Sequence, residues 1–246
     1  MIRKKFKNWL FHPVFFFQLL SSIIKKKFIP IYERKAIDFF KSKDIYKYFV
    51  SGNKDEMKPD LIDLKNIFEL ITSRKPKCVL EFGVGFSTIC ISLALKENEK
   101  NGFFGHLYTV DAEKFWIKNT EDKFPSDLKK YVTFHHSPCS VSTVNNQLVC
   151  NFDILPNISP NFIYLDGPSS SVGSIRGLGF DEGDRRMVNS DILLYESSSP
   201  SDFFILIDRR YVNMNFLINN LKYKYTVKKD LALGIVTFER KYQPYP

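Results

Sequence analysis

Residues 79–88 read Val-Leu-Glu-Phe-Gly-Val-Gly-Phe-Ser-Thr, and they decide how the chain is expected to fold. An apolar run ends next to an acid, Glu81, and two glycines then precede an apolar stretch with the character of a helix. Glycines let a backbone turn sharply and approach a ligand without a Cβ in the way. Ser87 or Thr88 can cap the following helix, whose N-terminus favours a negatively charged group. The stretch predicts a strand, a ligand-binding turn and a helix.

Strands and helices are predicted to alternate outward from this turn. Nearly continuous apolar runs predict strands at residues 78–82, 107–111, 131–135, 162–165 and 203–208. Helical spacing predicts helices at residues 61–74, 89–95, 113–122, 184–195 and 213–221. Two further strands, 223–229 and 232–239, close the chain. Residues 28–60 mix charges and aromatics without a sustained period, and we expect short helices and loops there.

This order predicts an α/β fold. Apolar strands that alternate with helices are typical of a parallel sheet covered on both faces. The final two strands have no helix between them, which indicates an antiparallel hairpin at one edge.

Four acids stand at the predicted carboxyl ends of strands: Glu81, Asp111, Asp166 and Asp208. Ligands of such sheets bind at the carboxyl ends of the strands. We therefore expect the four side chains to converge on one edge, with Asp111 placed to accept hydrogen bonds from ribose hydroxyls.

At these residues the sequence resembles class I S-adenosylmethionine-dependent methyltransferases. Residues 79–85 resemble their first motif, Val110-Asp111 resembles the second, and the likeness extends over residues 60–240. It implies a Rossmann-like doubly wound, mostly parallel seven-stranded sheet with a C-terminal antiparallel hairpin. The expected organisation is a basic, aromatic-rich helical extension over residues 1–58 and a methyltransferase-like domain over 59–246.

The resemblance implies S-adenosylmethionine as the cofactor. It places Glu81 and the loop from Gly83 to Gly85 against the methionine part, and Asp111 at the ribose. His135-His136-Ser137 stands where many members place an acid near the adenine. The cofactor-binding residues expected in all are Glu81, Gly83, Gly85, Ser87, Thr88, Asp111, Ala112 and His136.

Two other functional classes remain as alternatives to a methyltransferase. A NAD(P)-dependent oxidoreductase would want a third glycine at position 88, where the chain has Thr, and does not call for the acid at 81. A non-catalytic protein at a membrane surface could use the same turn to bind a nucleotide-containing ligand.

Residues on the acceptor side point to an acidic or sugar-type molecule. Asp166-Gly167-Pro168 opens a glycine-rich loop, Arg185-Arg186-Met187 follows it, and Asp208-Arg209-Arg210 ends the fifth strand. This set resembles plant glucuronoxylan 4-O-methyltransferases and loosely related bacterial sequences, which methylate a hydroxyl of a uronic acid. Guanidinium groups pair well with a carboxylate or phosphate. The expected catalytic residues are Asp166, Asp208, Arg209 and Arg186.

Asp166 has two possible roles. It could remove the hydroxyl proton as a general base, or it could bind a divalent cation together with Asp208. Catechol-type O-methyltransferases place metal carboxylates at both positions but follow the second with Asn, where this chain has Arg209. The other reading of Asp208 is a salt bridge to Arg185 or Arg186.

The positive charge of the chain is concentrated at its N-terminal end. The net charge of the 246 residues is +9, and residues 1–27 contain seven Lys or Arg and no acid. The rest is close to neutral, with 29 Lys plus Arg against 27 Asp plus Glu. A nucleic-acid enzyme is expected to carry its basic patch on the globular body, so that class is disfavoured.

Residues 9–24 form the only long apolar run, and basic clusters flank it. It is too short to span a bilayer as a helix, since about 20 apolar residues are needed. Residues 9–27 can lie on a membrane surface, or the helix can pack on its own domain or a second subunit. Four cysteines without metal-ligand spacing indicate reduced thiols. We expect a cytoplasmic protein, with a peripheral location on the membrane as the alternative.

Overall fold

The computed structural model describes residues 13–50, 58–168, 188–208, 210–230 and 234–241, and of residues 13–27 only the backbone. By their internal contacts the residues divide into two compact units, 1–65 with 230–234 and 66–229 with 235–246. The expected domain boundary at residue 58 stays a prediction.

The first unit is built on one long helix, α2 (Pro13–Ser42), followed by a short 3-10 helix, η1 (Tyr46–Phe49). The expectation of short helices and loops is therefore wrong over residues 28–42. Ala36 and Phe40 are fully buried, and the Phe40 ring lies 4.6 Å from that of Phe49. This packing stabilises a helix that the mixed charges and the internal Pro30 had concealed.

No helix among the described residues combines the length and the apolar character that crossing a membrane requires.

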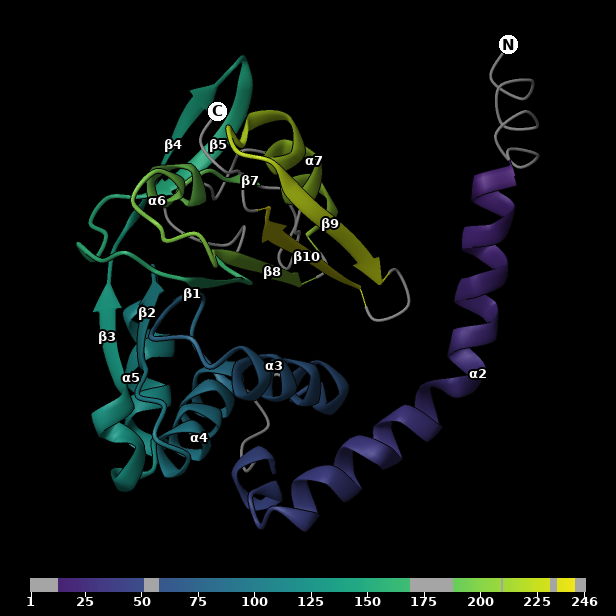
Figure 1. Cartoon of the computed structure of the whole chain (residues 1–246), viewed down its shortest axis with the longest axis vertical. Helices are drawn as coiled ribbons and strands as arrows, with labels where there is room; N and C mark the ends of the chain where they lie inside the picture. The colour runs from purple at the N-terminus through teal and green to yellow at the C-terminus, as the bar shows by residue number, and fades with distance from the viewer. Residues whose placement is uncertain (1–12, 51–57, 169–187, 209, 231–233, 242–246) are drawn as a thin grey trace. The chain divides into compact units, whose positions relative to one another are not determined.

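The second unit contains a seven-stranded sheet in the order β3-β2-β1-β6-β8-β10-β9 (Figure 1). The strands β3, β2, β1, β6 and β8 pair in parallel, and β10 pairs antiparallel with β8. The predicted mostly parallel sheet with an antiparallel C-terminal edge is confirmed. The bounds are β1 Cys78–Phe82, β2 His106–Asp111, β3 Val132–His136, β6 Phe162–Leu165, β8 Phe204–Asp208, β9 Tyr225–Asp230 and β10 Ile235–Arg240.

Helices cover both faces of this sheet, as predicted. Figure 1 shows α4 on one side, with α6, α7 and a small second sheet on the other. The helix α3 begins where expected because the Asp60 side chain accepts hydrogen bonds from the backbone N–H groups of Ile62 and Asp63. The bounds are α3 Leu61–Arg74, α4 Phe86–Lys100, α5 Lys114–Lys123, η2 Ser126–Tyr131, α6 Ile192–Glu196 and α7 Tyr211–Asn220.

The small sheet was not predicted. Its order is β4 (Cys139–Val144), β5 (Gln147–Phe152) and β7 (Val188–Asn189). Asn145 and Asn146 join the first two strands with φ of 48° and 62°, a conformation that asparagine adopts more readily than most residues. The predicted helix over residues 184–195 is wrong from 188 to 191, and residues 184–187 lie outside the described residues.

Buried polar side chains explain why that helix does not form. Asp191 accepts hydrogen bonds from the backbone N–H of Phe152 (3.0 Å) and from Asn151 Nδ2 (2.9 Å). Asn189 lies in strand β7, where it pairs with Cys150 of β5. Short polar side chains that bond backbone groups compete with helical hydrogen bonds.

One part of the core lies between the large sheet and the small one, and another lies under α3 and α4. The rings of Phe82 and Phe152 stack with centroids 5.5 Å apart, which ties the end of β1 to the hairpin. All four cysteines are free thiols: Cys78, Cys90, Cys139 and Cys150.

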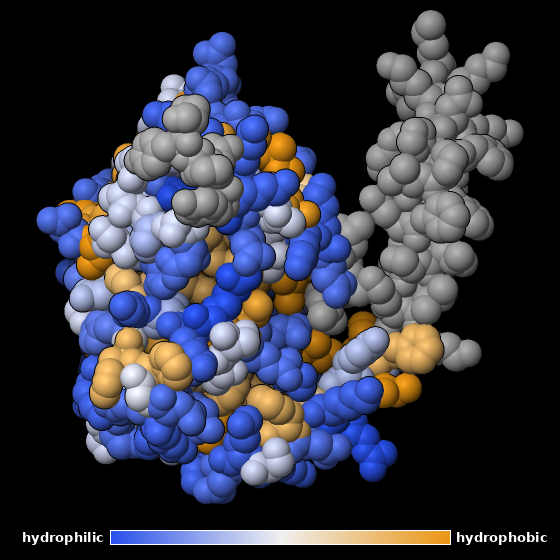
Figure 2. Space-filling model, in the orientation of Figure 1, coloured by the Kyte–Doolittle hydropathy of each residue, from blue (hydrophilic) through white to orange (hydrophobic). Residues whose placement is uncertain are grey.

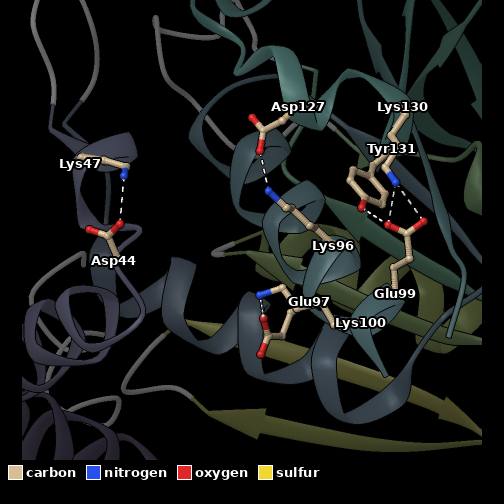
Figure 3. Close-up of polar contacts among 9 residues, drawn as sticks. All are labelled: Asp44, Lys47, Lys96, Glu97, Glu99, Lys100, Asp127, Lys130 and Tyr131. Carbon is tan, nitrogen blue, oxygen red and sulfur yellow. Dashed lines mark hydrogen bonds and ion pairs between the residues drawn. The ribbon is translucent and has the colours of Figure 1, made fainter. Parts of the chain in front are cut away.

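Ion pairs on the surface join α4 to η2 (Figure 3). Lys96 Nζ lies 2.5 Å from Asp127 Oδ2, and Lys130 Nζ lies 2.7 Å from Glu99 Oε2. The Tyr131 hydroxyl donates to the same Glu99 carboxylate. These contacts hold η2 against the helix that follows the glycine turn, so they fix the start of β3 relative to α4.

Candidate active site at the carboxyl ends of the strands

Glu81 lies at the centre of the site and is completely buried. Its Oε2 accepts a hydrogen bond from Thr88 Oγ1 at 2.7 Å, and Thr88 Oγ1 in turn accepts one from the backbone N–H of Gly85 at 3.0 Å. The Thr88 hydroxyl therefore connects the end of β1, the turn and the first turn of α4.

The second carboxylate oxygen of Glu81 has no such partner. Oε1 is buried and accepts no hydrogen bond within the described part of the chain. Burial raises the pKa of Glu81 to about 7, although nearby hydroxyls, including that of Thr88, lower it in part. A buried acceptor without a donor is costly, and a cationic or hydrogen-bonding ligand would satisfy it.

The two glycines of the turn serve different purposes. Gly83 has φ of +100°, and a Cβ there would lie 3.2 Å from the backbone N of Gly167. A Cβ on Gly167 would lie only 2.7 Å from the backbone N of Gly83. The turns after β1 and β6 thus touch through backbone atoms. A Cβ on Gly85 would meet no atom within 4 Å, so the turn is open on that side.

Asp111 holds the same turn from the end of β2. Its Oδ2 accepts the backbone N–H of Val84 at 3.0 Å, and its Oδ1 accepts that of Glu113 at 2.8 Å. Burial raises the pKa of Asp111 to about 6. A carboxylate oxygen can accept more than one hydrogen bond, so the Asp111 side chain has the capacity to accept one from a hydroxyl as well.

Asp166 faces an arginine that the sequence analysis did not select. The Arg210 side chain is 3% exposed, and its Nε lies 3.8 Å from Asp166 Oδ1. Its Nη2 donates to the backbone carbonyl of Pro168 at 3.1 Å and also to that of Asp166. One guanidinium therefore holds both the carboxylate and the backbone of the turn after β6. In the sequence, this role of Arg210 was indicated only by its position as the second of two arginines after Asp208.

Neither a protein-family model nor a curated protein matches the sequence. Solved structures do resemble it. The O-methyltransferase TomG of Streptomyces achromogenes, in complex with S-adenosylmethionine, is 12% identical, with 91% of this chain and 97% of that chain covered and a TM-score of 0.44. An O-methyltransferase of Bacillus cereus, in complex with S-adenosylhomocysteine, is 10% identical, with 91% and 100% covered and a TM-score of 0.45. A methyltransferase of Geobacter sulfurreducens is 9% identical, with 85% and 88% covered and a TM-score of 0.45.

The strand order and the one antiparallel strand define the fold. The chain has a Rossmann-like, doubly wound, mostly parallel seven-stranded sheet with one antiparallel strand at its C-terminal edge. The fold brings the ends of β1, β2 and β6 together, as the sequence predicted.

The remaining predicted site residues lie either at the ends of strands and the start of α4 or outside the described residues. His136 Nε2 lies 3.2 Å from the carbonyl oxygen of Ala112, which joins the ends of β3 and β2. Ser87 is partly exposed at the start of α4, and Asp208 is buried at the end of β8. Arg186 and Arg209 lie outside the described residues.

The described residues do not fit the tentative metal site at Asp166 and Asp208. No three His, Cys, Asp or Glu side chains converge in this part of the chain, and Asp166 faces the guanidinium of Arg210. A cation bound to Asp166 would be repelled by that positive charge.

Proposed function

We propose that the protein is an S-adenosylmethionine-dependent methyltransferase that methylates an oxygen of a small acidic or sugar-type acceptor. The observation that carries this proposal is the buried Glu81 carboxylate, one oxygen of which has no hydrogen-bond partner among the described residues, beside a turn that is open at Gly85. A ligand with an ammonium group and a ribose matches the two acids at the ends of β1 and β2.

In this proposal the cofactor lies across the turn. Glu81 Oε1 accepts a hydrogen bond from the ammonium of the methionine part, and Asp111 accepts hydrogen bonds from the ribose. The backbone from Gly83 to Gly85 approaches the ligand closely because no Cβ intervenes. Ser87 and Thr88 start the helix beside it, and Ala112 with His136 borders the adenine. When bound, the cofactor supplies a methyl group on a sulfonium, ready for displacement by an oxygen nucleophile.

The Thr88 hydroxyl favours this cofactor over a nicotinamide dinucleotide. It bridges Glu81 and the backbone N–H of Gly85, and a glycine at position 88 could make neither hydrogen bond. The dinucleotide fingerprint has glycine at that position.

Asp166 is proposed as the general base. It takes the proton from the acceptor hydroxyl as the oxygen attacks, which makes the oxygen more nucleophilic. Arg210 is a positioning residue, since its guanidinium orients both the Asp166 carboxylate and the turn that carries it. Asp208, Arg186 and Arg209 are proposed to bind the acceptor, with the two arginines on its carboxylate.

Calorimetry and transfer of a labelled methyl group test the proposal. We expect S-adenosylhomocysteine to bind and NADH not to bind. Asp111→Ala should weaken S-adenosylhomocysteine binding by about 100-fold or more, since a buried carboxylate and its ligand hydrogen bonds are lost. Asp166→Asn should leave that binding unchanged but lower methyl transfer to glucuronic acid by about 100-fold or more.

Glucose serves as the matched neutral acceptor and should be methylated far less than glucuronic acid. Binding of NADH without S-adenosylhomocysteine would contradict the cofactor assignment. Full turnover by Asp166→Asn would contradict the catalytic assignment alone.

A further inference from the structure

The apolar face of α2 continues past the part that the first unit covers. Phe28, Tyr32, Ala36 and Phe40 follow one another at intervals of four, so they lie along one face of the helix. The C-terminal two are fully buried, and Phe40 packs on Phe49 of η1. This end of the apolar face is therefore occupied within the first unit.

The other end of that face is exposed. Phe28, Ile29, Ile31 and Tyr32 are 44%, 45%, 49% and 47% exposed, respectively. Figure 2 shows hydrophobic atoms on α2 where its described part begins, next to the residues drawn in grey. Contiguous exposed apolar residues of this size mark interaction surfaces more often than isolated ones do. We call residues 28–32 the exposed turn.

Positive charge flanks the exposed turn in the sequence. Lys25, Lys26 and Lys27 directly precede it, and residues 1–27 contain no acid. On its C-terminal side, Glu33, Arg34 and Lys35 follow it and carry a net charge of +1. Amphipathic helices with this combination of aromatic and aliphatic residues next to lysines bind the interface of anionic membranes.

We propose that the exposed turn of α2 inserts into the surface of an anionic lipid bilayer, with the neighbouring lysines on the lipid phosphates. Charge complementarity favours lipid over a second copy of the chain, because two copies would bring their seven N-terminal positive charges together. The proposal does not rest on methyl transfer.

Vesicle co-sedimentation of the full chain tests the proposal. We expect binding to vesicles of phosphatidylcholine with phosphatidylserine, and at least about tenfold weaker binding to phosphatidylcholine alone, since each lysine near an anionic surface adds attraction. Raising the salt from about 0.1 M to about 0.5 M should weaken binding to the anionic vesicles.

The double variant Ile29→Gln/Ile31→Gln probes insertion. It should bind anionic vesicles about tenfold more weakly, because the variant lacks two aliphatic side chains whose transfer from water into the bilayer would favour binding. The matched control is Ile154→Gln/Leu194→Gln, which removes aliphatic side chains that are 68% and 64% exposed in the second unit and should bind like wild type. Circular dichroism checks that both variants are folded.

A fluorescent variant keeps the proposal testable if the double variant does not fold. Tyr32→Trp should show a blue shift of its emission with anionic vesicles and quenching by brominated lipid. Equal binding to neutral and anionic vesicles, or no shift, would overturn the proposal. So would a dimer in solution that the double variant dissociates while neither protein binds vesicles, since a second copy would then cover the exposed turn.

Discussion

Among single residues, Gly83 and Gly85 differ in how much space a Cβ atom would have at each position. At Gly83 a Cβ approaches the turn after β6, and φ is +100°. At Gly85 a Cβ projects into open space. One glycine is therefore required by the fold, and the other leaves room beside the site.

This difference gives a paired prediction. Gly83→Ala should lower the free energy of unfolding by about 1–3 kcal/mol because of backbone strain. Gly85→Ala should change it by less than about 1 kcal/mol, yet weaken S-adenosylhomocysteine binding by about tenfold or more through a clash with the ligand. Chemical denaturation and calorimetry measure the two effects. Unchanged binding in Gly85→Ala would mean that the ligand does not pass beside this glycine.

At the scale of elements, the turn after β6 depends on a residue from the start of α7. Arg210 donates hydrogen bonds to two carbonyls of that turn and faces the Asp166 carboxylate. The position of Asp166 is therefore set by the packing of α7 against the sheet, and not by the local sequence around it.

Arg210→Lys is the variant that tests this dependence. Lysine keeps the charge but cannot reach the carboxylate and two carbonyls with one planar group. We expect methyl transfer to fall by about tenfold or more, while the Kd of S-adenosylhomocysteine stays within about twofold. A matched Arg74→Lys variant, at the end of α3, should retain activity. Equal losses of binding and turnover in Arg210→Lys would indicate general disruption of the site.

For the whole molecule, buried carboxylic acids determine how stability varies with pH. Burial raises the pKa of Glu81 to about 7 and that of Asp191 to about 6. A group whose pKa is higher in the folded state binds more protons there, so it stabilises the fold at low pH. That contribution is lost as the pH rises from the unfolded pKa to the folded one.

We therefore expect the free energy of unfolding to fall between about pH 4 and about pH 7, with Glu81 contributing up to about 3 kcal/mol of the change. Glu81→Gln should flatten this dependence. Urea unfolding followed by circular dichroism at a series of pH values measures it, with Glu121→Gln on the surface as the control. The same slope in Glu81→Gln and wild type would show that Glu81 does not titrate in this range.

Local patterns in the sequence predicted much of the fold. Strands β1, β2, β6 and β8 are short and mostly apolar, and α3 begins at a capping Asp60. A few neighbouring residues are therefore enough to predict where these elements lie. The hairpin of β4 and β5 was missed although Asn145-Asn146 was a visible turn signal. The predicted helix over 184–195 is wrong at residues 188–191 because buried hydrogen bonds of Asp191 outweigh helical spacing.

The sequence alone determined the alternation of strands and helices, the convergence of acids at one edge and the glycine turn between them. These features depend on neighbours a few residues apart, whose periodicity the chain displays directly. Only the tertiary structure decided that Arg210 holds Asp166, that Gly83 touches Gly167 and that one oxygen of Glu81 is buried without a hydrogen-bond partner among the described residues. Such contacts join residues distant in sequence, and they depend on how separately formed elements pack.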